Sequence, residues 1–493
     1  MSMDPDFQQP QDIIEIPPGP RGPRLGADEW VARREGRREY LPSWLGRAER
    51  ESERIGWWPR LAIAGVAAAV LPGLGLGGFQ LQVGIDAMVI ALLAVGLNIV
   101  VGWAGLLDLG YVAFFGAGAY GYALLSSNQL GTSGIHLPAY FSVPIVMIGA
   151  ALLGLGVGLP SRRLIGDYLA IVTLFFGEAF VEFVNNVAPS KLGGPNGITG
   201  IDPIRGFTWQ ITSNYGYYYL LVIILVVTMG VLRLVERSRT GRAWRAVRED
   251  PLAAASMTIP VNRVKLAAFA AGAVVAALAG TIFAAQQASV FPTDFDTPIL
   301  ILIYAGLILG GAGSIAGAAT GALVLMVIYD GLLRSPSDSG YLFYGLILLT
   351  LVVKLRPWRR LAVVLAATVV LGFAAHAIAG AISARAVAGG PASAGWLGAA
   401  LRDWVIVPAN TQVAGNWGDV LLICLLVALV QVSRRWRTIL LPPVICLASF
   451  VWETKLVTEP SITRQLMIGA ILIVMMNARP QGLLGTRRVE TPI

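Results

Sequence analysis

Residues 93–124 read LAVGLNIVVGWAGLLDLGYVAFFGAGAYGYAL, an apolar stretch that glycines interrupt and in which two polar residues, Asn98 and Asp108, are embedded. Three small residues recur every four positions along it: Ala113, Ala117 and Gly121. This spacing predicts a helix with one smooth face, which a neighbouring backbone can approach closely. Polar side chains are costly inside a membrane, so Asn98 and Asp108 each need a hydrogen-bonding partner or a water-filled path. The stretch therefore predicts a membrane protein of closely packed helices.

The composition of the whole chain also indicates an integral membrane protein. Of its 493 residues, 56% are hydrophobic and 13% are charged, whereas soluble domains carry about 25% charged residues. The net charge of +8 raises the question of nucleic-acid binding. The arginines, however, gather in short loops beside apolar stretches, as the cytoplasmic loops of membrane proteins do. Two cysteines in apolar stretches and two distant histidines predict neither a disulfide framework nor a metal site.

Apolar stretches long enough to cross a bilayer, or nearly so, follow one another along the chain. About ten precede residue 357 and about four follow it, which predicts an all-α, polytopic helical bundle. The glycines near 310–314 predict a discontinuous or re-entrant helix. Basic residues gather in 1–60 and 236–263, so the N-terminus is expected in the cytoplasm and residues 189–216 on the opposite side.

The sequence divides into four expected parts. They are a polar cytoplasmic arm, a membrane core, an extra membrane segment, and a terminal helix with a cytoplasmic tail: 1–58, 59–357, 358–463 and 464–493. The division rests on two similar endings, YGLILLTLVVKLRP at 344–357 and IGAILIVMMNARP at 468–480. Either a membrane segment has been inserted before the last helix or the terminus has been duplicated.

The large basic loop at 236–263 contains a short predicted helix. Asp250 followed by Pro251 is a strong helix start, because the carboxylate accepts hydrogen bonds from free N–H groups and proline fits the first turn. The helix then presents three small residues: Ala253, Ala254 and Ala255. Such a helix can fit into a groove of a partner protein. An ordinary cytoplasmic connector is the alternative.

Polar residues also follow one face of an apolar helix expected at 166–188. They lie at helical intervals: Glu178, Glu182 and Asn185. A polar stripe of this kind is typical of a bundle interior or a cavity. The two carboxylates could line a substrate path, pair with an arginine, or lie in water near the outer interface. For Asn98 and Asp108, structural hydrogen bonds and substrate contact are the two interpretations.

A second series of glycines predicts another close helix contact near the end of the core. Its members are Gly306, Gly310, Gly313, Gly317 and Gly321. Helix packing is the first interpretation of this series. A hinge that moves during transport is the second.

Several of these stretches resemble the permease subunits of branched-chain amino acid ABC importers of the LivM type. The resemblance is carried by residues 93–124, by GDYLAIVTLFFGEAFVEFVNN at 166–186, by LGGPNGITGI at 192–201 and by QGLLG at 481–485. It extends over roughly 60–355 and 465–485.

The resemblance implies an inner-membrane permease for branched-chain or related aliphatic amino acids. It implies a second homologous permease subunit, two ATPase subunits and a periplasmic substrate-binding protein as partners, with no cofactor and no catalytic or metal site. The chain contains no Gly-x-x-x-x-Gly-Lys-Ser/Thr stretch, so ATP hydrolysis is expected in the partners. Permeases for urea or short amides share the first motif and are the nearest alternative. An ion-coupled secondary transporter, which also uses broken helices, is a rival of another class.

The same resemblance assigns roles to individual residues. The ATPase-coupling residues would be Asp250, Pro251, Ala253, Ala254, Ala255 and Thr258. Two of these depart from the family pattern, since Pro251 stands where Glu is usual and Thr258 where Gly is usual. The candidate translocation path comprises Asn98, Asp108, Glu178, Glu182 and Asn185, while the candidate packing or hinge residues are Ala113, Ala117, Gly121, Gly310, Gly313 and Gly317.

Overall fold

The computed structural model describes most of residues 56–484. It leaves out 1–55, 485–493 and short internal segments at 76, 130–134, 162–166, 188, 207–208, 335, 356–357, 392–394, 410, 432–433, 457–459 and 479–481. The predicted N-terminal arm and the end of the tail therefore lie outside the described residues. Contacts divide the chain into two units, residues 1–60 with 487–493 and residues 61–486, and the second unit contains the helical bundle.

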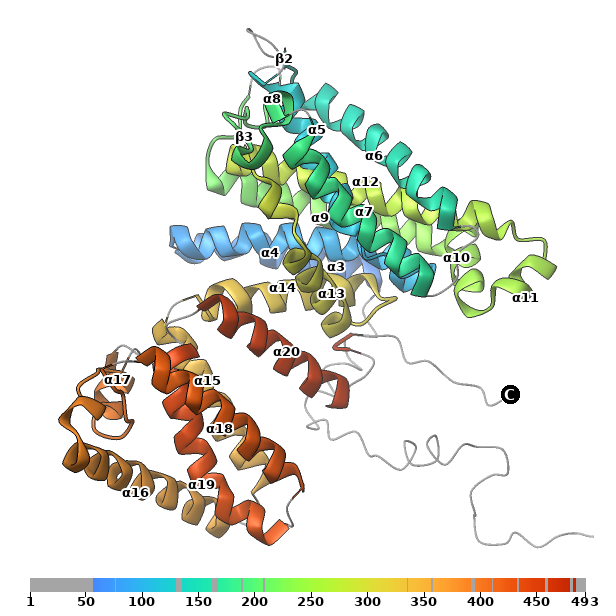
Figure 1. Ribbon diagram of the computed structural model, residues 1–493. Helices are drawn as coiled ribbons and strands as arrows, with labels where there is room; N and C mark the ends of the chain where they lie inside the picture. The colour runs from blue at the N-terminus through green and yellow to red at the C-terminus, as the bar shows by residue number, and fades with distance from the viewer. Residues whose placement is uncertain are drawn as a thin grey trace, which may run out of the picture. The chain divides into compact units, whose positions relative to one another are not determined.

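The described chain is helical almost throughout (Figure 1). Its α-helices are α3 (Trp57–Val70), α4 (Gly78–Leu97), α5 (Tyr111–Leu125), α6 (Ala139–Ser161), α7 (Asp167–Asn186), α8 (Pro189–Leu192), α9 (Asn214–Arg237), α10 (Arg239–Glu249), α11 (Pro251–Ser256), α12 (Val261–Gln287), α13 (Thr297–Gly310), α14 (Ile315–Met326), α15 (Pro336–Lys354), α16 (Trp358–Ile382), α17 (Gly395–Leu401), α18 (Thr411–Gln431), α19 (Arg434–Val451) and α20 (Pro460–Ala478). Three π-helices interrupt or end longer helices: η2 (Asn98–Trp103), η5 (Val327–Leu332) and η7 (Trp452–Leu456).

Two small antiparallel strand pairs join the loops at one end of the bundle. Strand β1 (Ser126–Ser127) pairs with β2 (Ile135–His136), and β3 (Ile198–Thr199) pairs with β4 (Ser289–Val290). Among the described residues, 8 helices are long and apolar enough to cross a membrane, and shorter apolar helices accompany them. The predicted all-α polytopic fold is confirmed.

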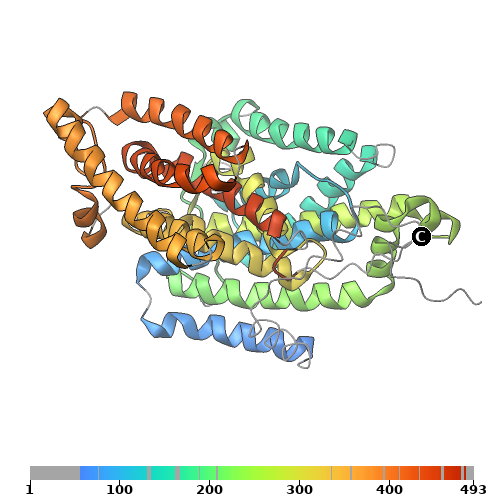
Figure 2. The same ribbon diagram turned by 90° about the horizontal axis from the view of Figure 1, so that it is seen from below.

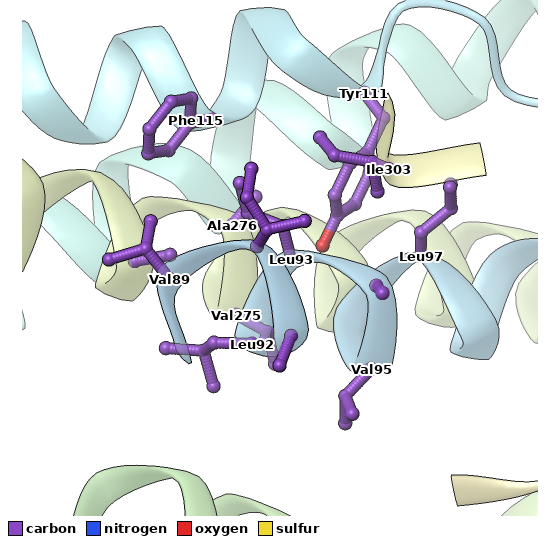
Figure 3. Close-up of a cluster of buried hydrophobic side chains, with 14 of the residues drawn as sticks. Val89, Leu92, Leu93, Val95, Leu97, Tyr111, Phe115, Val275, Ala276 and Ile303 are labelled. Atoms are coloured by element: carbon purple, nitrogen blue, oxygen red, sulfur yellow. The ribbon is translucent and has the colours of Figure 1, made fainter. Parts of the chain in front are cut away.

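Helix α4 forms the centre of the bundle. Most of its residues are apolar, which is the pattern of a buried helix, and 14 of its 20 residues are buried. Figure 3 shows Leu93 of α4 among side chains of α5 and α12, including Tyr111 and Val275. The Tyr111 hydroxyl donates a hydrogen bond to the Gly272 carbonyl oxygen of α12 at 3.3 Å. Helices α4, α5 and α12 therefore position Asn98 and Asp108, which lie between α4 and α5 in the chain.

Helices α5 and α12 approach each other through glycines. A Cβ atom added at Gly118 would lie 2.4 Å from the Ala277 Cα, and one added at Gly280 would lie 2.2 Å from the Phe115 carbonyl oxygen. The predicted face with Ala113, Ala117 and Gly121 lies beside this contact. Gly121 faces Val146 of α6, whose Cγ2 would be 3.2 Å from an added Cβ. The close backbone contacts of α5 with α12 therefore lie at Phe115 and Gly118, outside the predicted repeat.

Helices α13 and α14 form a tight antiparallel pair at the second glycine series. An added Cβ at Gly310 would lie 1.8 Å from the Gly317 carbonyl oxygen, and one at Gly321 would lie 2.3 Å from the Gly310 nitrogen. Gly311 and Gly313 form the turn between the helices with φ values of 110° and 99°. The discontinuity expected near 310–314 is thus a turn between two short helices.

The C-terminal helices separate into two groups by their packing. Leu351 of α15 joins Leu361 and Val364 of α16 in a small apolar cluster of their own, and α19 packs against both α16 and α18 (Figure 1 and Figure 2). Ile468 of α20, in contrast, belongs to the main core cluster. The apolar clusters therefore place α15 with α16 and α19, and α20 with the main core.

Candidate functional site

Helices α10 and α11 meet at Asp250. Its Oδ1 accepts hydrogen bonds from the Leu252 nitrogen at 2.8 Å and from the Ala253 nitrogen at 3.1 Å, so it caps α11. The predicted helix start at Asp250 and Pro251 is confirmed. Helix α10 buries Trp244 and Val247, while Arg239, Arg242 and Arg245 are exposed. The pair of helices therefore forms a compact unit on the bundle.

The exposed surface of α11 differs from the predicted one. Ala254 is 4% exposed and packs against the chain itself, so it does not form part of the exposed surface of α11. Ala253 and Ala255 are exposed. The most exposed apolar side chains are those of Leu252 and Met257, at 83% and 76%. Sequence reasoning passed over these two, although large apolar residues in a polar loop were a visible signal.

Thr258 adopts a left-handed backbone conformation directly after α11. Its φ is 63°, a value that β-branched residues rarely adopt and that glycine adopts without strain. The chain turns here from α11 into α12, which begins at Val261. Thr258 therefore occupies a backbone position suited to the glycine that the family usually carries.

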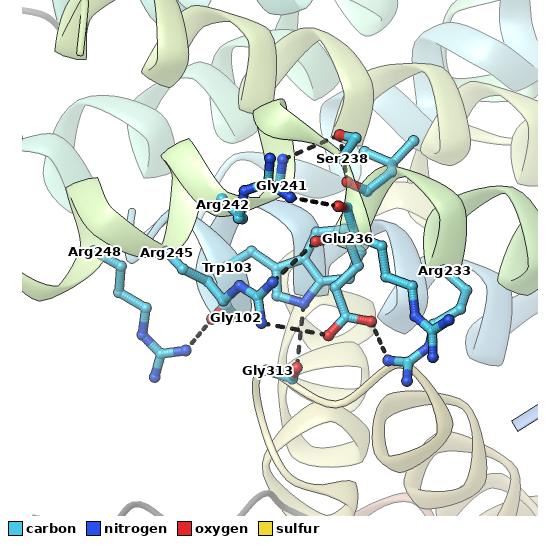
Figure 4. A network of polar contacts seen from close by, with 12 residues as sticks. Gly102, Trp103, Arg233, Glu236, Ser238, Gly241, Arg242, Arg245, Arg248 and Gly313 are labelled. Carbon is cyan, nitrogen blue, oxygen red and sulfur yellow. Dashed lines mark hydrogen bonds and ion pairs between the residues drawn. The ribbon is translucent and has the colours of Figure 1, made fainter. Parts of the chain in front are cut away.

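A polar network lies beneath α10, around the π-helical end of the α4 span (Figure 4). The Arg248 guanidinium donates a hydrogen bond to the Gly102 carbonyl oxygen. Trp103 Nε1 donates to the Gly313 carbonyl oxygen at 3.2 Å, and Asn98 Oδ1 accepts from the Gly313 nitrogen at 2.7 Å. Asn98, a candidate for the translocation path, therefore holds the turn between α13 and α14.

Asp108 also forms hydrogen bonds inside the bundle. Its Oδ1 accepts a hydrogen bond from the Gly110 nitrogen at 3.0 Å, and its carbonyl oxygen accepts one from the Tyr304 hydroxyl at 2.6 Å. Asp108 is 0% exposed. Within the described part of the chain, Asp108 Oδ2 and Asn98 Nδ2 are buried atoms without a hydrogen-bond partner. These two residues are thus oriented by hydrogen bonds to the surrounding backbone and to Tyr304.

The polar stripe of α7 lies on an exposed face. Glu178 and Glu182 are exposed and Asn185 is half-buried. The Thr297 hydroxyl donates to Glu178 Oε1, and the Asn186 amide donates to Glu182 Oε2. The same face carries large apolar side chains, and Phe175 is 75% exposed. Asn98 and Asp108 are therefore buried, whereas the three candidate path residues of α7 are exposed or half-buried.

The loop at 192–201 is fixed by pairing with the segment that follows α12. Ile198 pairs with Val290 and Thr199 with Ser289. Gly197 has a φ of 66°, and an added Cβ there would lie 2.2 Å from the Val290 carbonyl oxygen. The motif therefore needs glycine because of its left-handed backbone and its close contact with β4.

A second set of outer loops meets at His136. Its Nδ1 lies 2.7 Å from Asp202 Oδ2, and its Nε2 lies 2.9 Å from Asn128 Oδ1. The Arg205 guanidinium donates to the His136 carbonyl oxygen. Sequence reasoning did not predict this cluster, since its members come from distant loops without a local pattern.

Comparison with known proteins gives consistent matches. The model of the family described as "Branched-chain amino acid transport system / permease component" matches residues 80–353. The high-affinity branched-chain amino acid transport system permease protein LivM of Escherichia coli K12 is 36% identical over 296 residues, which are 55% of this chain and 67% of that protein.

More distant relatives carry related names. The corresponding permease protein BraD of Pseudomonas aeruginosa is 25% identical over 252 residues, 48% of this chain and 80% of that protein. LivH of Salmonella typhimurium is 27% identical over 255 residues, 48% of this chain and 79% of that protein. No solved structure gave a significant match.

Proposed function

Because the chain belongs to the family of branched-chain amino acid transport permease components, we propose that it is the membrane-spanning permease of an ATP-driven importer of these amino acids. The family match over 80–353, with 36% identity to LivM, is the observation that carries the proposal. The named relatives favour branched-chain amino acids over urea or short amides. They likewise favour an importer permease over an ion-coupled secondary transporter.

The proposed complex contains two ATPase subunits that bind α10 and α11. Leu252 and Met257 support this, because exposed apolar side chains of this size are typical of an uncovered protein-binding surface. Asp250 and Pro251 form the start of the helix. Ala253 and Ala255 place only small side chains on its exposed surface, and Thr258 ends the segment. Ala254 supports the helix from inside.

A second, related permease subunit is proposed to cover the exposed face of α7. Carboxylates within a membrane-spanning helix are costly in contact with lipid and are normally covered by protein or line a water-filled path. Glu178 and Glu182 lie on that face beside Phe175. We assign the translocation path to this face, with Asn185 at its edge, and assign Asn98 and Asp108 to the interior that supports it.

The proposed orientation in the inner membrane follows the basic residues. Arg237, Arg239 and Arg242 are exposed around the start of α10, and basic loops remain in the cytoplasm. The N-terminus then also lies in the cytoplasm. The loops with 192–201 and His136 lie in the periplasm, where a substrate-binding protein would deliver the amino acid.

Reconstitution tests this function directly. The chain is placed in proteoliposomes with its ATPase subunits, the related permease and the binding protein, and uptake of radiolabelled leucine, isoleucine and valine is measured with and without ATP. We expect ATP-dependent uptake, and no hydrolysis by the chain alone. Uptake of urea or acetamide without uptake of leucine would replace the proposed substrate class.

A further inference from the structure

Arg248 connects the α10–α11 unit to the interior of the bundle in a way that the other arginines of α10 do not. The described hydrogen bonds of Arg242 and Arg245 end on Arg237 and Glu236, within the same stretch of chain. Arg248 instead crosses to the carbonyl oxygen of Gly102, at the end of the α4 span. It lies two residues before Asp250, the cap of α11.

The fold leaves a slot for the Arg248 side chain between two glycines. Gly105 has a φ of 68°, and an added Cβ there would lie 2.7 Å from Arg248 Cγ. Gly313 has a φ of 99°, and an added Cβ there would lie 3.2 Å from Arg248 Nη1. The Arg248 side chain therefore lies between two glycines, whose backbone it can approach because they carry no side chain.

Arg248 binds the Gly102 carbonyl oxygen, which lies at a helix end where the regular α-helical hydrogen bonding is interrupted. Residues 98–103 form a π-helix, and the last carbonyl groups of a helix have no helical donor. A guanidinium at this end also interacts favourably with the helix dipole. Arg248 thus supplies a donor that the α4 span itself lacks.

The same helix end holds the turn between α13 and α14. Both backbone groups of Gly313 are bound from the π-helix, the nitrogen by Asn98 and the carbonyl oxygen by Trp103. The indole of Trp103 in turn stacks on that of Trp244 of α10, with ring centroids 6.0 Å apart and planes 23° apart. Contacts of α10 therefore meet, at one helix end, the residues that bind the α13–α14 turn.

We propose that Arg248 is the positioning residue that couples movement of the ATPase-docking unit α10–α11 to the π-helix at 98–103, and through it to the α13–α14 turn. The proposal rests on the proposed function for the source of the movement. The linkage itself is a property of this chain and can be measured without substrate.

The first experiment measures the linkage in the chain alone. Spin labels are attached at Leu252 and Leu107, both exposed, in a variant without Cys424 and Cys446, and their distance distribution is recorded in nanodiscs. Arg248→Gln is expected to broaden the distribution, while Arg242→Gln, which removes the same charge from the same helix, leaves it unchanged. Arg248→Lys, which keeps a cationic donor, should lie between them.

The second experiment measures coupling in the assembled importer. In complexes that have assembled, Arg248→Gln is expected to lower the amount of amino acid transported per ATP hydrolysed by roughly 2- to 30-fold. Wild-type coupling and an unchanged distance distribution in Arg248→Gln would overturn the proposal, as would loss of assembly in both Arg248→Gln and Arg248→Lys. If the wild-type importer moves no amino acid, the proposed function fails, while the distance measurement still decides the linkage.

Discussion

Thr258 is a β-branched residue in the left-handed conformation that glycine adopts most easily. Replacing it with glycine removes the contact between Cβ and the backbone that makes this conformation costly. We expect Thr258→Gly to raise the free energy of unfolding by about 1 kcal/mol. This value is the backbone strain that glycine relieves in the folded chain, reduced by the conformational entropy that glycine adds to the unfolded chain. Denaturant unfolding in mild detergent measures the difference. Thr258→Ala keeps a Cβ and serves as the control, and an equal gain in that variant would refute the strain argument.

Substitutions at two residues of α11 test ATPase binding and folding of the chain separately. Leu252 is 83% exposed and Ala254 is 4% exposed. Leu252→Asp should leave the chain stable but weaken its complex with the ATPase subunits by about 1–3 kcal/mol, since an apolar anchor is replaced by a charge. Ala254→Asp should lower the yield of folded chain itself. Co-purification with the ATPases and thermal stability of the chain alone give the two readouts, and unchanged ATPase binding by Leu252→Asp would remove α11 from the interface.

At the scale of whole elements, the α5–α12 contact depends on the absence of a side chain at Gly280. An added Cβ there would lie 2.2 Å from the Phe115 carbonyl oxygen, a backbone atom that cannot move by itself. Gly280→Ala should therefore cost about 1–3 kcal/mol of stability by overpacking. Gly149 of α6 has nothing within 4 Å of an added Cβ, so Gly149→Ala should gain about 0.5–1 kcal/mol. Thermal unfolding in detergent compares the pair, and an equal response would contradict the packing argument.

Helices were predictable here because apolar stretches, proline and a capping aspartate are local signals. Asp250 capped the predicted helix, and the turn after Gly310 lay where glycines gather. The inward face of Ala254 was not predictable, since a helix of six residues is too short for its apolar period to define a face. The contact of Arg248 with Gly102 was not predictable either, because it joins residues 146 positions apart.

On the scale of the whole molecule, we expect helices α15 to α19 to be separable from the main core. The described members of the main apolar cluster include Ile468 of α20 but no residue of α15 to α19. Arg464 of α20 also forms an ion pair with Asp330 at 3.4 Å. Removing residues 336–459 and joining η5 to α20 through a short Gly/Ser linker should therefore leave a folded core that still imports amino acid.

Uptake of radiolabelled leucine at matched expression tests this deletion. Removal of residues 460–484 is the comparison, and it should abolish uptake because α20 would no longer cover α13. Loss of uptake in a well-folded, complex-forming 336–459 deletion would place residues of this range in the transport machinery.

The late position of α20 in the chain has a consequence for biosynthesis. The backbone nitrogens of Leu483 and Leu484 donate hydrogen bonds to the carbonyl oxygens of Leu309 and Gly310. The segment that follows α20 therefore binds the end of α13. The ribosome makes α15 to η7 between these partners, which at usual rates of synthesis takes roughly 6 to 25 seconds. During that interval the surface of α13 stays uncovered in the nascent protein. A chain whose synthesis stops before α20 would therefore leave this surface of α13 uncovered.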